Sequence, residues 1–104
     1  MAQAVGILEV FGLATAFVAA DAGCKAADVP IEHFDKNKPA NADKLPVPLI
    51  VCIKFRGDIA AVEAAMDAAA SAAEGISGGV DKFVIANPEE GTQKMLKLNA
   101  FDKN

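Results

Sequence analysis

Alternation of apolar and polar positions is clearest in the segment Leu49–Arg56, and it predicts a β-strand there. One face of this strand carries Leu49, Val51, Ile53 and Phe55, and the other carries Ile50, Cys52, Lys54 and Arg56. Three further segments rich in β-branched and aromatic residues predict strands, namely Ala4–Leu13, Val29–Lys36 and Val80–Ala86. Pro30 restricts Val29–Lys36 to a sheet edge or places the proline at the start of the strand.

Helical spacing of apolar residues follows the first and third strands. In Leu13–Ala27 the residues Leu13, Phe17, Ala20 and Cys24 form one stripe, which we expect to face the core. The segment Ile59–Glu74 is rich in alanine and carries a narrower stripe of Ile59, Val62 and Met66. We expect Gly75 to end this helix in the left-handed conformation.

A short last helix is predicted to extend through Leu98. Asn87, Pro88 and Glu90 fit a cap, a proline at the first helical position and a glutamate three residues after the cap.

The tripeptide Arg56-Gly57-Asp58 resembles a cell-attachment motif, but its position predicts a structural turn. Arg56 ends a strand, Gly57 allows a sharp bend, and the Asp58 carboxylate is expected to cap the following helix. We therefore interpret the tripeptide as the hinge between a strand and an alanine-rich helix.

The order of elements is strand, helix, strand, strand, helix, strand, helix. This order predicts an α+β fold, a ferredoxin-like βαββαβ unit with an antiparallel sheet and an appended C-terminal helix. A chain of 104 residues fits one domain. We expect residues 1–99 to form it and residues 100–104 to be a polar tail.

Composition points to a soluble oligomer. Apolar residues make up 53% of the chain, and the mean hydropathy is +0.28. The longest apolar run, LPVPLIVCI, falls far short of the ~20 residues of a spanning helix. Because no Lys or Arg precedes Lys25 and Glu9 interrupts the N-terminal apolar stretch, we expect no signal peptide. The apolar surface is then expected to be buried between copies of the chain.

Charge and chemistry exclude several classes. A net charge of −4 argues against nucleic-acid binding. Cys24 and Cys52 show no CxxC spacing, so we expect reduced structural thiols, with Cys24 facing the core and Cys52 within the sheet. The chain has one histidine, His33, and its spacing from the cysteines matches no known metal site. Gly78-Gly79 is expected to form a turn before the last strand. No enzyme activity, metal or cofactor is predicted.

Three segments together resemble one family: AVGILEVFGLATAFVAADAGCKAADV, IKFRGDIAAVEAAMDAAASAA and KFVIANP. The motifs within them are Gly6-x-x-Glu9, Ala20-Asp21 followed by Lys25, and the Arg56-Gly57-Asp58 turn before an alanine-rich helix. The chain resembles the shell proteins of bacterial microcompartments, of the single-domain, hexamer-forming class (the BMC domain). The resemblance leaves out the segment Asn37–Pro48 and the C-terminal tail.

The resemblance implies cytoplasmic homohexamers that tile, together with shell paralogues, around encapsulated enzymes. A central pore would pass small polar metabolites, with no cofactor and no contact with membrane or nucleic acid. Lys25 would lie at the hexamer edge. Many family members carry an arginine at the position of Asn87, so this edge would lose the charge-assisted, two-pronged hydrogen bonding of arginine.

The resemblance also implies a pore loop that departs from the family pattern. Lys36 matches a lysine that usually precedes a tight glycine-serine turn, which is here replaced by NKPANADKLPVP. The implied pore-loop residues are Lys36, Asn37, Lys38, Pro39, Ala40, Asn41, Ala42, Asp43 and Lys44. The loop would either reshape the channel or fold away from it. It contains no cysteine, so no iron–sulfur cluster is expected.

A second class stays open on the sequence alone. A small ferredoxin-like oligomeric regulatory protein, which binds a metabolite between subunits, would show the same order of elements. Its oligomer would be a dimer or trimer.

Overall fold

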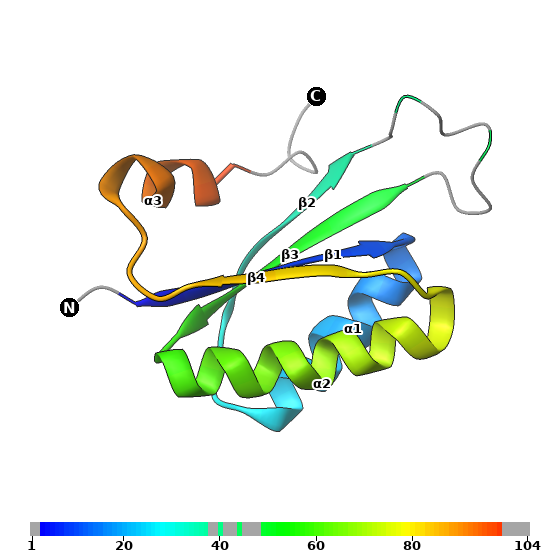
Figure 1. Ribbon diagram of the computed structural model, residues 1–104, viewed down its shortest axis with the longest axis horizontal. Coiled ribbons are helices and arrows are strands. Elements are labelled where there is room, and N and C mark those ends of the chain that lie inside the picture. Colours follow the sequence, from blue (N-terminus) through cyan, green and yellow to red (C-terminus); the bar gives the residue numbers. More distant parts are fainter. Residues whose placement is uncertain (1–2, 38–39, 41–43, 45–48, 99–104) are drawn as a thin grey trace.

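The computed structural model of the chain describes residues 3–37, 40, 44 and 49–98. Within these ranges it has four strands and three helices (Figure 1). In chain order they are β1 (Ala4–Phe11), α1 (Leu13–Ala26), β2 (Ile31–Asn37), β3 (Ile50–Gly57), α2 (Ile59–Ser77), β4 (Asp81–Ile85) and α3 (Glu90–Leu96). The predicted α+β class and the predicted order of elements are confirmed.

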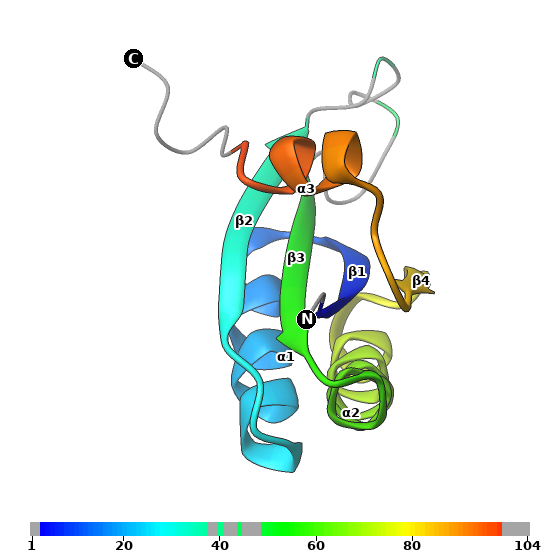
Figure 2. The same ribbon diagram turned by 90° about the vertical axis from the view of Figure 1, so that its left-hand side faces the viewer.

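The four strands form one antiparallel sheet in the order β2-β3-β1-β4. This is the order of a ferredoxin-like βαββαβ unit, with β4 and β2 at the edges. Helices α1 and α2 cover one face of the sheet, whereas α3 lies on the opposite side (Figures 1 and 2). We call the side that carries α3 the open face.

The core lies between the sheet and the helices α1 and α2. The expected alternation in β3 is confirmed, because Val51, Ile53 and Phe55 have no exposed surface. Helix α2 contributes Val62 and Met66 together with four buried alanines, whereas Ile59 at its start is 42% exposed. The small alanine side chains allow the helix to lie close to the sheet.

The predicted stripe on α1 is wrong at three of its four positions, and only Ala20 is buried as expected. Phe17 is 60% exposed, and Leu13 and Cys24 also face outward. The buried face consists of small residues, namely Thr15, Ala16, Ala19, Ala20 and Gly23. Because α1 packs closely on α2 and β3, this face excludes large side chains. Phe17 instead contacts Phe34 of β2, with ring centroids 5.2 Å apart.

Two predicted helix ends are also wrong. Helix α2 continues through Gly75, and its C-cap is Gly78, which has a positive φ of +67° but an extended ψ of −177°. Gly78 and Gly79 lie in the short connection before the last strand, both with positive φ. Helix α3 begins after Glu89, whose carboxylate accepts a 2.6 Å hydrogen bond from the Gly91 amide. This local bond replaces the expected cap at Asn87.

Candidate functional site

The end of the β2–β3 hairpin carries the first residues of the predicted pore loop. Lys36 and Asn37 finish β2 and pair with Val51 and Ile50 of β3. Ala40 and Lys44 are exposed. Lys38, Pro39, Asn41, Ala42 and Asp43 lie outside the described residues, so the shape of the loop stays a prediction.

A hollow of about 210 Å³ lies at the base of this loop. It is lined by Glu9, Asp35, Lys36, Asn37, Ile50 and Cys52. Glu9 pairs with Cys52, and Cys52 pairs with Asp35, so the three side chains form one row across β1, β3 and β2. Glu9 belongs to a family motif in the sequence, but no local pattern predicts that it or Asp35 lies at the base of the loop. That proximity depends on the strand order β2-β3-β1.

Cys52 within this hollow is held as a neutral thiol. Burial raises the pKa of Cys52 to about 11, the Lys54 ammonium lowers it, and the carboxylates of Glu9 and Asp35 add to the increase. A thiol that titrates so high is a poor nucleophile and a poor metal ligand at neutral pH. This agrees with the expected structural thiol within the sheet.

Cys24 does not face the core as expected. Its side chain is exposed, and its thiol donates a 3.5 Å hydrogen bond to the Val29 carbonyl. Partial burial and the Asp21 carboxylate raise the pKa of Cys24 as well. Over the described part of the chain, no group of three or more His, Cys, Asp or Glu residues is arranged to hold a metal ion.

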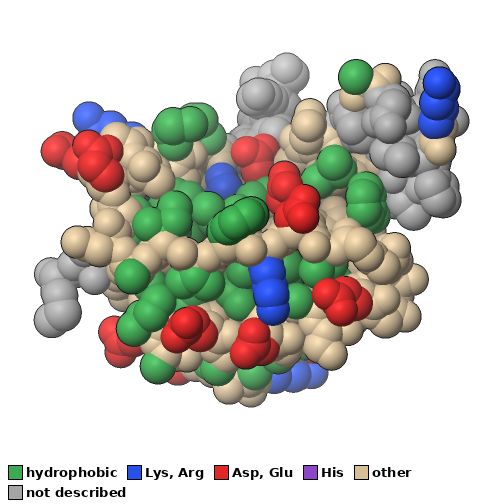
Figure 3. Space-filling view, in the orientation of Figure 1, with side chains coloured by type: hydrophobic (Ala, Val, Ile, Leu, Met, Phe, Trp, Pro, Cys, Tyr) green, Lys and Arg blue, Asp and Glu red, His purple; other side chains and the backbone are tan. Residues whose placement is uncertain are grey.

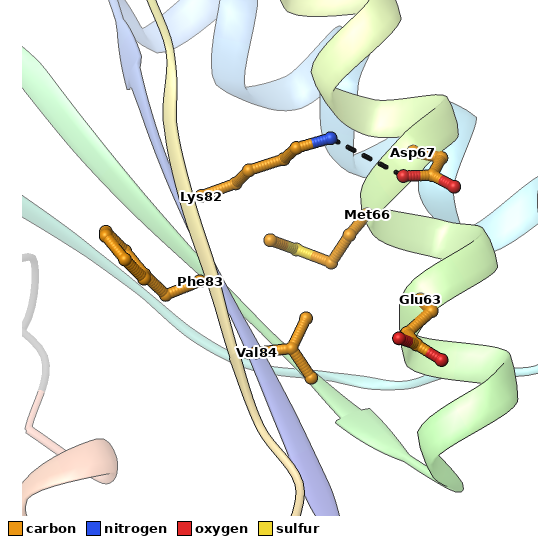
Figure 4. Close-up of a pocket in the computed structure, with 6 residues that line it drawn as sticks. All are labelled: Glu63, Met66, Asp67, Lys82, Phe83 and Val84. Carbon is orange, nitrogen blue, oxygen red and sulfur yellow. Dashed lines mark hydrogen bonds and ion pairs between the residues drawn. The ribbon is translucent and has the colours of Figure 1, made fainter.

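A second hollow of about 200 Å³ lies between α2 and the edge strand β4. Its lining consists of Glu63, Met66, Asp67, Lys82, Phe83 and Val84 (Figure 4). Lys82 and Val84 point towards α2, whereas Phe83 points away on the other side of β4 (Figure 4). The Lys82 ammonium lies 3.5 Å from the Asp67 carboxylate, so an exposed ion pair joins the strand to the helix.

The edge strand β4 is exposed along its whole length. Phe83 is 73% exposed, and Val84 and Ile85 follow at 37% and 36%. Apolar side chains are visible on both sides of this edge (Figure 3). Contiguous apolar surface of this kind is typical of an interaction site.

The two predicted edge residues both lie on the surface. Lys25, near the end of α1, forms a 2.8 Å ion pair with Asp21, one helical turn earlier. The hydrogen bond that the Lys25 ammonium donates to Asp21, together with the Asp21 charge, raises the pKa of Lys25. Asn87 is exposed in the segment between β4 and α3. Both side chains are therefore accessible to a neighbouring molecule.

The Arg56-Gly57-Asp58 tripeptide joins β3 to α2. Gly57 has φ +153°, a conformation that favours glycine, and a Cβ there would lie 3.3 Å from Val29 Cγ1. Asp58 occupies the N-cap position, but its side chain makes no capping hydrogen bond, contrary to expectation. The Arg56 side chain is only 11% exposed, and its Nε lies 3.9 Å from Glu32. The arginine is thus turned into the protein.

The described residues contain no helix long and apolar enough to cross a membrane.

Comparison with known proteins places these features in a family. Residues 4–88 match the BMC domain. The shell protein PduA of Citrobacter freundii is 34% identical over 94 residues, which cover 90% of this chain and 91% of PduA. The carboxysome shell protein CcmK3 of Halothece sp. is 30% identical over 105 residues, which cover 99% and 94% of the two chains.

Other similar proteins are longer than this chain. The shell protein EutK of Salmonella typhimurium is 36% identical over 96 residues, which cover 92% of this chain and 53% of EutK. The crystal structure of a microcompartment protein from Desulfitobacterium hafniense DCB superposes with a TM-score of 0.67 at 25% identity, covering 93% of this chain and 48% of that one. This chain therefore spans about half the length of both proteins. The match over residues 4–88, together with the agreement in fold, shows that the chain belongs to the BMC domain family.

Proposed function

We propose that this chain is a structural protein of a bacterial microcompartment shell. The observation that carries the proposal is the BMC domain match over residues 4–88. The likeness to the shell proteins PduA and CcmK3, which extends over most of their length, supports it. The role would be structural and not enzymatic, as it is for the shell proteins that the chain resembles.

The working form of the chain would be a cyclic homohexamer in the cytoplasm. Such hexamers would tile with other shell proteins into facets that enclose enzymes. Exposed apolar side chains support burial between copies, because Phe83 on β4 and both Phe17 and Val18 on α1 lie at the surface of the single chain. Lys25 and Asn87 would meet neighbouring hexamers at the edge.

The pore would be formed by the segment between β2 and β3. Lys36 and Asn37 would lie at its entrance, followed by residues 38–44. The carboxylates of Glu9 and Asp35, in the hollow at the base of the loop, would offset the positive charge of Lys36, Lys38 and Lys44. Small polar metabolites are the expected cargo, and rings of side-chain charge would set their selection.

Native mass spectrometry followed by electron microscopy of the concentrated protein tests the proposal. A hexameric mass and extended sheets, tubes or closed bodies are the expected results. A dimer or trimer that forms no extended assembly would favour the ferredoxin-like regulatory protein instead. The shell protein and the regulatory protein predict different results in both measurements, so either measurement can contradict the shell function.

A further inference from the structure

Helix α3 lies by itself on the open face, apart from α1 and α2 (Figure 2). The helix itself contributes little apolar surface to this face. Leu96 is the buried residue of the helix, at 5% exposure, whereas the neighbouring Met95 is 68% exposed. Apolar packing of one leucine is a weak anchor for a helix of seven residues.

A buried lysine supplies the main anchor. The Lys54 side chain is 7% exposed, and it rises from β3 on the open face. Its ammonium group donates hydrogen bonds to the carbonyl oxygens of Leu96, at 3.1 Å, and Leu98, at 2.8 Å. The Asp35 carboxylate lies 3.9 Å away. Carbonyls at a helix end need donors from outside the helix, and here a cation from the middle of the sheet provides them.

Arg56 forms the second anchor. It lies two residues after Lys54 in β3, so both side chains project from the same face. Its Nη2 donates to the Gln93 side-chain oxygen of α3. The side-chain nitrogen of Gln93, Nε2, in turn donates to the Pro88 carbonyl at 3.4 Å. The Arg56 Nη1 atom is buried and has no hydrogen-bond acceptor among the described residues. The open face therefore holds α3 through two basic side chains of one strand.

We propose that α3 is a hinged strap, clamped to the open face by Lys54 and Arg56, which opens as a unit while the sheet, α1 and α2 stay folded. Segments with few apolar contacts and mostly polar attachment open locally, at a lower free energy than the whole domain. Opening would bring two of the chain's ten basic side chains into solvent together. Asp35 beside Lys54 and Glu32 beside Arg56 would stay on the sheet and partly balance their charge. The strap thus controls whether these two basic side chains reach solvent, and this inference does not depend on the shell function.

Hydrogen–deuterium exchange of the full chain, read by mass spectrometry, tests the strap. In the unmodified protein, the amides of residues 90–98 are expected to exchange well before those of α2. The substitution Lys54→Met keeps an unbranched side chain but removes the donor to both carbonyls. Because hydrogen bonds from charged groups are strong, we expect exchange in residues 90–98 to rise roughly tenfold to hundredfold, with α2 unchanged.

The matched control is Lys82→Met, which removes an exposed lysine and its ion pair with Asp67. It is expected to leave exchange in α3 unchanged. Gln93→Ala removes the acceptor of Arg56 from the helix itself, without touching the sheet. It should also accelerate hydrogen exchange in α3. If Lys54→Met does not fold, this variant alone tests the strap. Trypsin cleavage after Lys94 and Lys97 should accelerate in both clamp variants.

The strap is overturned if residues 90–98 of the unmodified protein exchange only as slowly as α2. It is also overturned if the folded clamp variants leave α3 exchange unchanged, or if they accelerate exchange in α2 to the same degree. The last result would make Lys54 and Arg56 parts of one cooperative core.

Discussion

Gly23 of α1 faces the ring of Phe55 in β3 with no space for a side chain between them. A Cβ added at Gly23 would lie 2.7 Å from Phe55 Cζ and 3.1 Å from the Ala65 carbonyl oxygen of α2. Three elements thus meet at one glycine, and this contact fixes how closely α1 can approach the sheet.

Gly23→Ala is therefore expected to destabilise the fold. Overpacking a tight core costs roughly 1–3 kcal/mol, which outweighs the gain of about 1 kcal/mol from replacing glycine by alanine in a helix. Gly75→Ala is the matched control, since Gly75 is an exposed residue of α2 with nothing within 4 Å of an added Cβ. Urea unfolding at a fixed protein concentration should show a loss for the first variant and a gain for the second. A gain at Gly23 would contradict the packing.

Cys52 predicts a loss of stability at alkaline pH. Its pKa is raised to about 11 in the folded chain, above the ordinary thiol value of 9.0. The folded state therefore favours the neutral thiol, and this contribution is complete below pH 9 and is lost as the pH rises through 11. Cys52→Ala should flatten the decline in unfolding free energy between these values relative to the unmodified chain. An unchanged decline would show that other groups cause it.

Lys25 predicts a separation between hexamer formation and tiling. If the residue lies at the hexamer edge, Lys25→Ala and Lys25→Asp should leave the hexamers intact and abolish extended sheets, because a tile repeats the contact on every side. Native mass spectrometry and electron microscopy measure the two properties. Lys94→Ala changes another exposed lysine and should preserve the sheets. Sheets of normal extent in both Lys25 variants would remove the residue from the interface.

The pore loop predicts selective permeation. Replacing residues 38–48 with a Gly-Ser-Gly turn removes Lys38, Asp43 and Lys44 but keeps Glu9 and Asp35 in the hollow at the base of the loop. The relative entry of a small anion into assembled shells should therefore fall, and that of a small cation should rise. The effect should weaken with added salt. Equal rates before and after the replacement would place the loop away from the channel.

Sequence patterns were sufficient to predict buried positions where large apolar residues alternate along a strand. The buried row of Val51, Ile53 and Phe55 follows directly from the period of a strand. Patterns failed on α1, because the packed face there selects small side chains and leaves Phe17 outside. A search for large apolar residues cannot detect a surface defined by close backbone approach.

The candidate site was less predictable for a related reason. Lys54 alternates with apolar neighbours as an exposed lysine would, and its burial depends on α3, which arrives more than forty residues later. Asp35 likewise reaches Glu9 and Cys52 only through strand pairing. Contacts made by tertiary structure leave no local signal in the sequence.

The exposed edge strand β4 affects the solubility of a newly synthesised chain before it assembles. Unpaired backbone groups beside Phe83, Val84 and Ile85 are a template on which another strand can add. The charges of Asp81 and Lys82 protect only one end of the strand. If the chain were produced faster than it assembles with other copies, unassembled chains with an exposed β4 edge would accumulate. We therefore expect overproduction to reduce solubility before it impairs folding, so that supply has to be matched to the rate of assembly.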